Sequence, residues 1–363
     1  MNAREQIHEM FARFGERGPQ LQDSDEFVTA NYEELKASGL YAAAVPVELG
    51  GMGMEVPELA QMLNTMARTS PSTALAFAMH THVVAVAAWR WKNQKAPVQP
   101  MLEKVAKDRM LLITTGGGDW LDSSGEAVAV DGGYRVNARK SFCSAVPVGS
   151  VLATSAVVKD KGEVIHFPVP LKAEGVRIEQ TWKALGMRNT GSHDVVLENV
   201  FVPEASVQMK RPVSKWHPLF DLLCMFSLLL VYSVYLGVAQ SARERTLAMV
   251  RKRKPSELLN QEIGEMENQL HGAELAWADW VACAAAARPG RESTNRSMID
   301  RTLMARGILG TVDAAMNAAG GAAFYRAHGL EQLFRDAQGA RFHPLQEGPQ
   351  KQFAARTALG LEI

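Results

Sequence analysis

Residues 194–202 read Asp-Val-Val-Leu-Glu-Asn-Val-Phe-Val, and residues 163–169 read Glu-Val-Ile-His-Phe-Pro-Val. Both runs are short, rich in β-branched residues and separated from their neighbours by glycine-containing turns, which is typical of β-strands. They lie inside residues 110–211, and on either side of that part the apolar residues recur at helical spacing. The order helical, β, helical predicts an α+β fold with mostly α structure.

We expect three domains: an N-terminal α-helical domain over residues 1–109, a middle, antiparallel, β-barrel-like domain over 110–211, and a C-terminal α-helical bundle over 212–363. The chain of 363 residues is long enough to bury a sizeable core. Its 39 basic and 39 acidic residues give a formal charge of zero. Nucleic acid and anionic lipid are therefore not expected as partners.

The three cysteines lie far apart and lack the spacing of a zinc site or a disulfide framework. We therefore expect no metal site and a reducing, cytoplasmic environment, and the first ten residues lack the apolar run of a secretory signal. The apolar stretch Leu222–Ala239 has the minimum length for a membrane span. Polar residues interrupt it, and we interpret it as a buried core helix rather than a span.

Several motifs resemble those of the acyl-CoA dehydrogenase superfamily, in the same order along the chain. The middle-domain motif is matched by residues 131–144, which read Asp-Gly-Gly-Tyr-Arg-Val-Asn-Ala-Arg-Lys-Ser-Phe-Cys-Ser. The resemblance covers the chain from about residue 30 to its end. The other matching stretches are residues 41–54, 68–80, 186–203, 320–321 and 330–336.

The resemblance implies a flavoprotein that holds FAD between the β domain and a C-terminal four-helix domain. It also implies a homo-oligomer, a dimer or a tetramer, in which a neighbour supplies part of each FAD site. As an oxidoreductase of fatty acid metabolism, such a protein would dehydrogenate an acyl-CoA thioester. The electrons would then pass to an electron-transfer flavoprotein or another acceptor.

The match to the middle-domain motif implies a flavin contact at Phe142-Cys143-Ser144, with Phe142 against the ring and Ser144 donating a hydrogen bond near N5. The alternative is a plain strand with one inward aromatic residue. Relatives carry a Thr-Glu-Pro loop, and here the matching run has Thr114, Thr115 and three glycines. The glycines would allow close approach of the backbone to the cofactor, and a flexible turn also explains them.

The FAD diphosphate has its own candidate residues near two helix ends. By resemblance, Arg253 would bind the partner's diphosphate, since its planar fork suits a bidentate contact, although Ser-Glu replaces the usual Phe-Gly. Asn317 stands where relatives often carry Gln, and Gly320 and Gly321 would let the backbone approach the cofactor. The alternatives are a solvated basic helix end, a polar helix position and a helix stop.

The catalytic base of an acyl-CoA dehydrogenase is a carboxylate, in most relatives a Glu-Gly nine residues after the Arg of an Arg-Asp pair. Here that count from Arg335 reaches Pro344, and Glu347 lies three residues later. A second family position corresponds to Ser227. The remaining catalytic candidates are Glu347, brought in by a loop insertion, and His343, whose ordinary pKa suits proton transfer near neutral pH.

Each of these candidates also has a structural interpretation. Glu347 could be an exposed carboxylate at a helix start, and His343 could shape the loop before its proline. His80 would line the substrate cavity by resemblance, or it could pack between helices. Arg335-Asp336 is interpreted as a structural pair that positions the last loop.

Three functions compete. The first is an FAD-dependent acyl-CoA dehydrogenase that transfers hydride to flavin N5. The second is a flavin-dependent monooxygenase of the same fold that uses reduced flavin and oxygen, which the missing carboxylate favours. The third is a non-catalytic flavoprotein-like scaffold. We rank the dehydrogenase first, because the order, length and motif coverage favour it.

Overall fold

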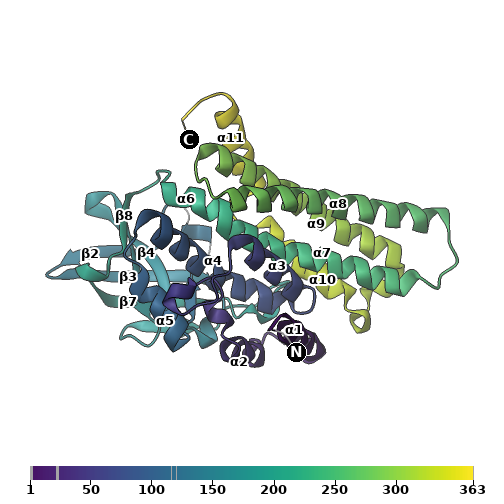
Figure 1. The fold of residues 1–363 in the computed structure, drawn as a ribbon, viewed down its shortest axis with the longest axis horizontal. Coiled ribbons are helices and arrows are strands. Elements are labelled where there is room, and N and C mark those ends of the chain that lie inside the picture. Colours follow the sequence, from purple (N-terminus) through teal and green to yellow (C-terminus); the bar gives the residue numbers. More distant parts are fainter. Residues whose placement is uncertain (1–2, 22–23, 116, 120, 363) are drawn as a thin grey trace.

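The computed structural model describes residues 3–21, 24–115, 117–119 and 121–362, and these fold as helices, then a sheet, then helices, as predicted (Figure 1). Proline in the first turn of α3, α4 and α5 helps to set each helix start, because its fixed φ suits the first turn and no amide hydrogen bond is needed there. The N-terminal helices are α1 (Ala3–Leu21), α2 (Thr29–Ala37), α3 (Val56–Ala67), α4 (Pro71–Gln94) and α5 (Gln99–Asp108).

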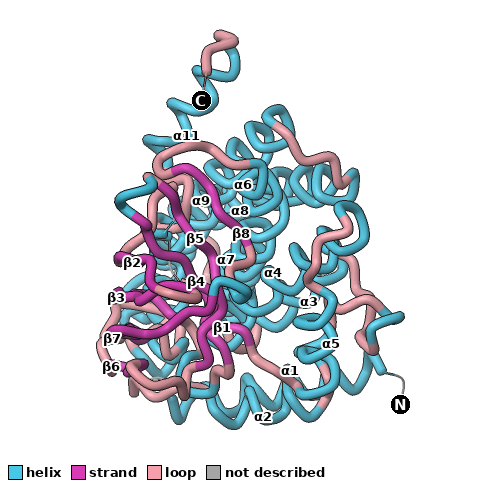
Figure 2. Tube along the Cα trace, turned by 90° about the vertical axis from the view of Figure 1, so that its left-hand side faces the viewer, coloured by secondary structure: helices cyan, strands magenta, loops and turns pink. Residues whose placement is uncertain are grey.

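The described strands of the middle part form one sheet in the order β6-β7-β3-β2-β4-β5-β8, with β1 beside β4 (Figure 2). The pairs are antiparallel except for β1 with β4 and β2 with β4, which are parallel. The runs at 163–169 and 194–202 form β5 and β7, as predicted. The strands are β1 (Leu112–Thr114), β2 (Glu126–Val130), β3 (Gly133–Cys143), β4 (Val151–Val158), β5 (Glu163–Pro170), β6 (Val176–Glu179), β7 (His193–Pro203) and β8 (Met209–Pro212).

The C-terminal part is a bundle of long helices that extends away from the sheet (Figure 1). The mostly α, α+β fold class is therefore confirmed, and the domain boundaries at 109/110 and 211/212 stay predictions. Its elements are α6 (Pro218–Leu222), the π-helical turn η8 (Leu223–Ser227), α7 (Leu228–Val250), α8 (Glu257–Ala286), α9 (Arg291–Ala319), α10 (Leu330–Ala337), the 3-10 turn η11 (Gln338–Arg341) and α11 (Glu347–Ala358).

Two helical segments of the described chain are long and apolar enough to cross a membrane, Pro71–Gln94 and Pro218–Val250. Both are mostly buried inside the protein, and in the second 94% of the most apolar window is buried. The stretch Leu222–Ala239 lies in this second segment, so the prediction of a buried core helix is confirmed. Tyr232 and Tyr235 of α7 are among the largest fully buried side chains.

A tight backbone contact joins the sheet to α10. A Cβ built on Gly186 would lie 2.2 Å from the carbonyl oxygen of Arg335. Beside it the amide of Met187 donates to the buried carboxylate of Asp336, and Arg335 donates to the carbonyl of Leu185 at 3.1 Å. Arg335 forms its ion pair with Glu331 at 2.6 Å rather than with Asp336, and the two neighbouring residues hold the β-domain turn on α10 through these separate contacts.

Gly186→Ala is expected to lower the free energy of unfolding by about 1–3 kcal/mol, because the added methyl group would force this turn away from α10. Gly264→Ala on α8 is the matched control. Open space surrounds Gly264, and alanine favours the helix by up to about 1 kcal/mol. Chemical denaturation followed by circular dichroism measures both changes, and two variants of equal stability would contradict the contact.

Candidate functional site between the sheet and the C-terminal loop

Phe142 lies at an irregular end of β3. The register between β3 and β7 shifts between Lys140 and Cys143, and Phe142 adopts a φ of +61°, which is rare for a bulky residue. Phe142 is 55% exposed, and its ring meets Trp182 edge-on with 6.0 Å between the ring centroids. An unusual backbone conformation that exposes an aromatic ring is a feature of ligand-binding surfaces.

The hydroxyl of Ser144 ends a chain of hydrogen bonds that runs into the β domain. The carbonyl of Met187 accepts from the indole of Trp182 at 3.1 Å and lies 2.9 Å from the hydroxyl of Thr190; in the arrangement in which Thr190 donates to it, the Thr190 oxygen accepts from Ser192, 2.7 Å away. Ser192 has then used its single proton, and it must accept from Ser144 at 2.8 Å. Ser144 is therefore left as an acceptor for a ligand, whereas the sequence suggests a donor.

The loop after β1 touches the C-terminal loop. Thr114 ends β1 and Thr115 follows it, both half-buried, and Gly116 lies outside the described residues. A Cβ built on Gly117 would lie 2.8 Å from Cγ of Pro344. Pro344 is the position at which the family spacing places the catalytic base. It therefore lies where the loop after β1 meets the C-terminal loop.

Two buried cations hold the glycine-rich loop on the sheet. The Lys140 side chain is fully buried, and its Nζ lies 2.7 Å from Oδ2 of Asp119 and 2.5 Å from the carbonyl of Ser124. Burial disfavours the charged form of Asp119, but Lys140 outweighs this and lowers the pKa of that carboxyl below its ordinary value. Arg211, also buried, donates to the carbonyl of Asp122 at 3.2 Å.

Side chains from α7 and α9 hold the C-terminal loop. The buried Arg301 donates to the carbonyls of Ala340 and His343 at 3.1 and 2.8 Å, and Tyr232 donates to the same Ala340 carbonyl at 2.6 Å. The hydroxyl of Tyr235 lies 2.9 Å from Nε2 of His343. Burial of the ring, together with the charge of Arg301, lowers the pKa of His343 to about 4. The imidazole is therefore neutral near pH 7.

α4 carries two histidines with different roles. His80 accepts from the amide of Leu112 at Nδ1, and its Nε2 lies 2.8 Å from the carbonyl of Tyr41, so its two ring nitrogens join α4 to β1 and to the 3-10 turn Leu40–Ala42. His82 is half-buried, and its Nδ1 is shielded from solvent with no hydrogen-bond partner. Burial and the neighbouring His80 and His343 lower the pKa of His82 to about 4. His82, rather than His80, has the unpaired ring atom.

The two family positions of the catalytic base are Pro344 and Ser227, and neither is a carboxylate. The nearby carboxylate of Glu347 is held in ion pairs. Glu347 lies in the first turn of α11, where it pairs with Arg306 and, at 2.6 Å, with Lys351. These contacts lower the pKa of Glu347 to about 2, which makes it a poor proton acceptor. Ser227 ends the π-helical turn η8, and its hydroxyl oxygen is buried without a partner.

Arg253 closes the C-terminal end of α9. Its terminal nitrogens donate to the carbonyls of Ala318 and Ala319 at 3.2 and 2.8 Å, which would otherwise lack partners at the helix end. The guanidinium of Arg253, predicted to bind a diphosphate, thus forms hydrogen bonds within the chain instead. At 1.5 Å per residue this end lies about 27 Å along α9 from Arg301.

The other three diphosphate candidates surround the same helix end. Asn317 is exposed, and its amide donates to Glu262 at 3.3 Å. Gly320 has a φ of +61° and ends α9, and a Cβ on Gly320 or Gly321 would meet open space. The structure therefore separates the predicted site residues into two groups, one beside the sheet and one at the far end of α9.

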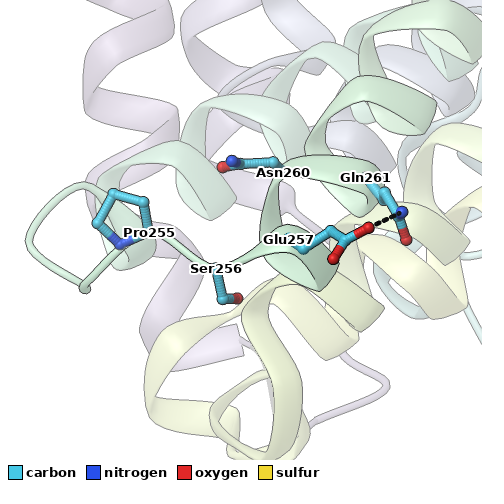
Figure 3. Close-up of a pocket in the computed structure, with 5 residues that line it drawn as sticks. All are labelled: Pro255, Ser256, Glu257, Asn260 and Gln261. Carbon is cyan, nitrogen blue, oxygen red and sulfur yellow. Dashed lines mark hydrogen bonds between the residues drawn. The ribbon is translucent and has the colours of Figure 1, made fainter.

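The turn after Arg253 leads into a shallow pocket at the start of α8 (Figure 3). Glu257 and Gln261 are joined by a hydrogen bond of 3.4 Å, and Ser256 caps the helix by accepting from the amide of Leu259. A flavin ring needs an aromatic or apolar wall, and a diphosphate needs cations. The lining has neither a cation nor an aromatic ring; it consists of Pro255, Ser256, Glu257, Asn260 and Gln261.

Three further residues near the site, Tyr235, Arg301 and His82, were not predicted from the sequence. Tyr235 lies in an apolar run whose periodicity marks no face, and its partner His343 is 108 residues away. Arg301 is indistinguishable in sequence from an exposed helix cation. His82 did carry a signal, because its spacing of two from His80 places the two rings on different faces of α4.

Family models match both helical parts of the chain. The model of the acyl-CoA dehydrogenase N-terminal domain matches residues 2–107, and that of the acyl-CoA dehydrogenase C-terminal domain matches residues 229–347. Together they span more than half of the chain. Two solved structures share the fold over nearly its whole length. KijD3 in complex with FMN and dTDP-3-amino-2,3,6-trideoxy-4-keto-3-methyl-D-glucose has a TM-score of 0.88 and 22% identity, covering 100% of this chain and 95% of that chain. FMN-bound TdsC from Paenibacillus has a TM-score of 0.85 and 19% identity, covering 99% of this chain and 98% of that chain.

Three relatives show the range of activities in proteins similar to this chain. An amino sugar nitrososynthase of Streptomyces peucetius is 24% identical, covering 91% of this chain and 86% of the relative. A putative acyl-CoA dehydrogenase of Bacillus subtilis is 25% identical, covering 94% and 92%. A dibenzothiophene monooxygenase of Mycolicibacterium goodii is 28% identical, covering 68% and 65%. The motifs, the fold and both family models agree, and the chain belongs to the acyl-CoA dehydrogenase superfamily.

Proposed function

We propose that this chain is a flavin-dependent monooxygenase, which uses reduced FMN and dioxygen to add one oxygen atom to a small organic substrate. The observation that carries the proposal is the hydroxyl chain that leaves Ser144 as an acceptor. Reduced flavin has a proton on N5 and offers a donor there, whereas oxidised flavin offers an acceptor. A site with an acceptor at this point favours the reduced form.

The two family positions of the catalytic base, Pro344 and Ser227, carry no carboxylate, and this supports the same conclusion. Acyl-CoA dehydrogenation needs a base that removes a weakly acidic proton, and Glu347 is held by Arg306 and Lys351. Pro344 stands at the usual position of that base. His343 and His82 are neutral near pH 7 and supply hydrogen-bonding ring nitrogens in its place. Oxygen transfer requires such groups and does not require a carboxylate.

The residues beside the sheet fit a flavin ring. Phe142 would lie against the ring, Ser144 would accept from its N5 proton, and the backbone of Thr114 and Thr115 would approach its edge. When bound, the reduced flavin supplies two electrons to dioxygen, so that one oxygen atom enters the substrate and the other leaves as water. The chain's own residues orient the ring and keep hydrogen-bonding groups uncharged.

FMN fits this chain better than the FAD expected from the resemblance. The ADP half of FAD would need a cationic site, and Arg253 is committed to the carbonyls of Ala318 and Ala319. The solved structures of KijD3 and TdsC, which share this fold, contain FMN. A separate flavin reductase would then supply the reduced cofactor, in place of an electron-transfer flavoprotein that removes electrons.

The substrate class follows from the relatives rather than from a pocket in this chain. A nitrososynthase oxidises the nitrogen of an amino sugar, and dibenzothiophene is a sulfur heterocycle. We therefore propose oxygenation of a nitrogen or sulfur atom, not a step of fatty acid metabolism. The three free, buried cysteines agree with a cytoplasmic location for such an enzyme.

The purified protein should bind reduced FMN at least tenfold more tightly than oxidised FMN or FAD. Anaerobic titration with each flavin, followed by flavin absorbance and fluorescence, measures the three dissociation constants. Admission of oxygen to the reduced complex should then consume dioxygen. Bleaching of bound oxidised flavin by an acyl-CoA would instead establish dehydrogenation and overturn the proposal.

Ser192→Ala tests the role of the hydroxyl chain. The variant removes the acceptor of Ser144, whose proton becomes free to donate, so the preference for reduced over oxidised FMN should shrink several-fold. Thr190→Ser keeps the hydroxyl chain and should keep the preference. Equal preferences in wild type and Ser192→Ala would remove the hydroxyl chain as the cause.

A further inference from the structure

We propose that Tyr235 is a positioning residue that holds His343 with its proton on Nδ1, so that Nδ1 is the nitrogen that donates a hydrogen bond to the reacting partner. The role of that donor in turnover rests on the proposed function. The position of the proton does not, because it is a property of the chain without any ligand. The two can therefore fail separately.

The position of the proton follows from counting donors and acceptors. Tyr235 is fully buried, and the hydroxyl's hydrogen-bond partner within the described chain is Nε2 of His343 at 2.9 Å. If Nε2 donated to the phenol oxygen, the hydroxyl proton would be left buried and unpaired, at a cost of about 1–3 kcal/mol. The phenol must therefore donate to Nε2. A neutral imidazole that accepts at Nε2 carries its proton on Nδ1.

The charges around the pair keep both groups neutral over the working pH range. Burial, with the neighbouring Tyr232 and Asp336, raises the pKa of Tyr235 well above its ordinary value despite Arg301. Burial and Arg301 lower the pKa of His343 to about 4. The phenol thus keeps its proton to donate, and the imidazole keeps a lone pair to accept it, between about pH 5 and 9.

Gly339 provides the space that Tyr235 needs. A Cβ on Gly339 would lie 2.4 Å from the hydroxyl oxygen of Tyr235 and 3.1 Å from its Cζ, so a side chain there would push the hydroxyl away from its present place. Gly339 lies in η11 and its φ is not positive, so alanine is compatible with the backbone there. The position lacks a side chain because the hydroxyl occupies its place.

The rest of the loop is held independently of the His343 ring. Arg301 and Tyr232 donate to backbone carbonyls of Ala340 and His343, which fixes the main chain, and the Tyr232 ring meets the imidazole edge-on with 6.3 Å between the ring centroids. Neither contact involves a ring nitrogen, so both leave the imidazole free to exchange tautomer. The contact with Tyr235 removes that freedom. Tyr232→Phe is accordingly a matched control, since it deletes a buried hydroxyl of the same helix and the same loop without touching the ring.

The experiment is NMR of the flavin-free protein with ¹⁵N-labelled histidine, using long-range correlations that report which ring nitrogen is protonated. His343→Asn assigns the signal by its disappearance. In wild type and in Tyr232→Phe, His343 should show a protonated Nδ1 and an unprotonated Nε2. In Tyr235→Phe, at least half of the population should shift to a protonated Nε2. A protonated Nε2 in wild type, or no change in Tyr235→Phe, would overturn the proposal.

Gly339→Ala tests the same contact from the other side. The new methyl group should displace the hydroxyl and produce the tautomer shift of Tyr235→Phe, and the double variant Gly339→Ala/Tyr235→Phe should show no further shift. A shift that adds in the double variant would contradict a shared cause. If the tautomer behaves as proposed and no flavin or oxygen chemistry is found, the proposed function fails while the positioning role stands.

Discussion

Lys140→Met is expected to lower the free energy of unfolding by about 3–5 kcal/mol, since it leaves the buried Asp119 carboxylate without its cation. The loss should exceed that of ordinary surface changes because Nζ of Lys140 also donates to the carbonyl of Ser124. Urea denaturation of the variant, followed by tryptophan fluorescence, measures the difference. The glycine-rich loop would then lose its hold on the sheet.

Two further variants isolate the cause. Lys159→Met breaks an exposed ion pair of similar length, 2.9 Å from Glu126, and should cost less than about 1 kcal/mol. Adding Asp119→Asn to Lys140→Met removes the uncompensated charge and should restore part of the lost stability. If Lys140→Met were as mild as Lys159→Met, the buried pair could not be the anchor of the loop.

His343→Gln is expected to lower kcat of the oxygenation about 10²–10³-fold, the usual effect of removing one oriented donor from a reacting centre. The side-chain amide of the new Gln would occupy the place of the imidazole Nε2, beside Tyr235. No hydrogen-bond donor would then remain at the place of Nδ1. His343→Asn places its amide nitrogen near the Nδ1 position and should keep more of the activity. The dissociation constant for reduced FMN should change less than twofold in both variants.

Stopped-flow oxidation of the reduced complex, with product analysis, separates these outcomes. His271→Gln on the exposed face of α8 provides the control and should leave kcat unchanged. Wild-type turnover in His343→Gln would remove His343 from the site. Greater activity in His343→Gln than in His343→Asn would place the working nitrogen at Nε2 and contradict the proton position argued above.

The architecture was predictable because its signals are local. Residues 163–169 and 194–202 are short runs rich in β-branched residues, a pattern typical of strands, and in the structure they form β5 and β7. Within the predicted C-terminal bundle, α9 spans Arg291–Ala319: its apolar residues recur at helical spacing and Pro289-Gly290 stands directly before it, and neither signal depends on distant residues. The predicted homo-oligomer depends on contacts between copies, and it stays a prediction.

The site was predictable only in part, because its chemistry depends on contacts that sequence spacing does not encode. The family motif made Phe142 and Ser144 candidates, which stay predictions, and the direction of the Ser144 hydrogen bond depends on Thr190 and Ser192, nearly 50 residues away. Counting from a motif made Glu347 a candidate base. Its ion-pair partner Arg306 lies 41 residues earlier, and the sequence around Glu347 does not predict this contact.

The way Arg253 closes α9 limits how cofactor preference can change in this chain. Freeing the guanidinium for a diphosphate would open the carbonyls of Ala318 and Ala319, so a gain in FAD affinity would come with a frayed helix end. If the chain prefers FMN as proposed, substitution near Arg253 would have to preserve this helix end as well as bind the diphosphate. Redesign, or natural divergence between FMN and FAD members of the superfamily, has to supply a replacement cap together with the liberated arginine.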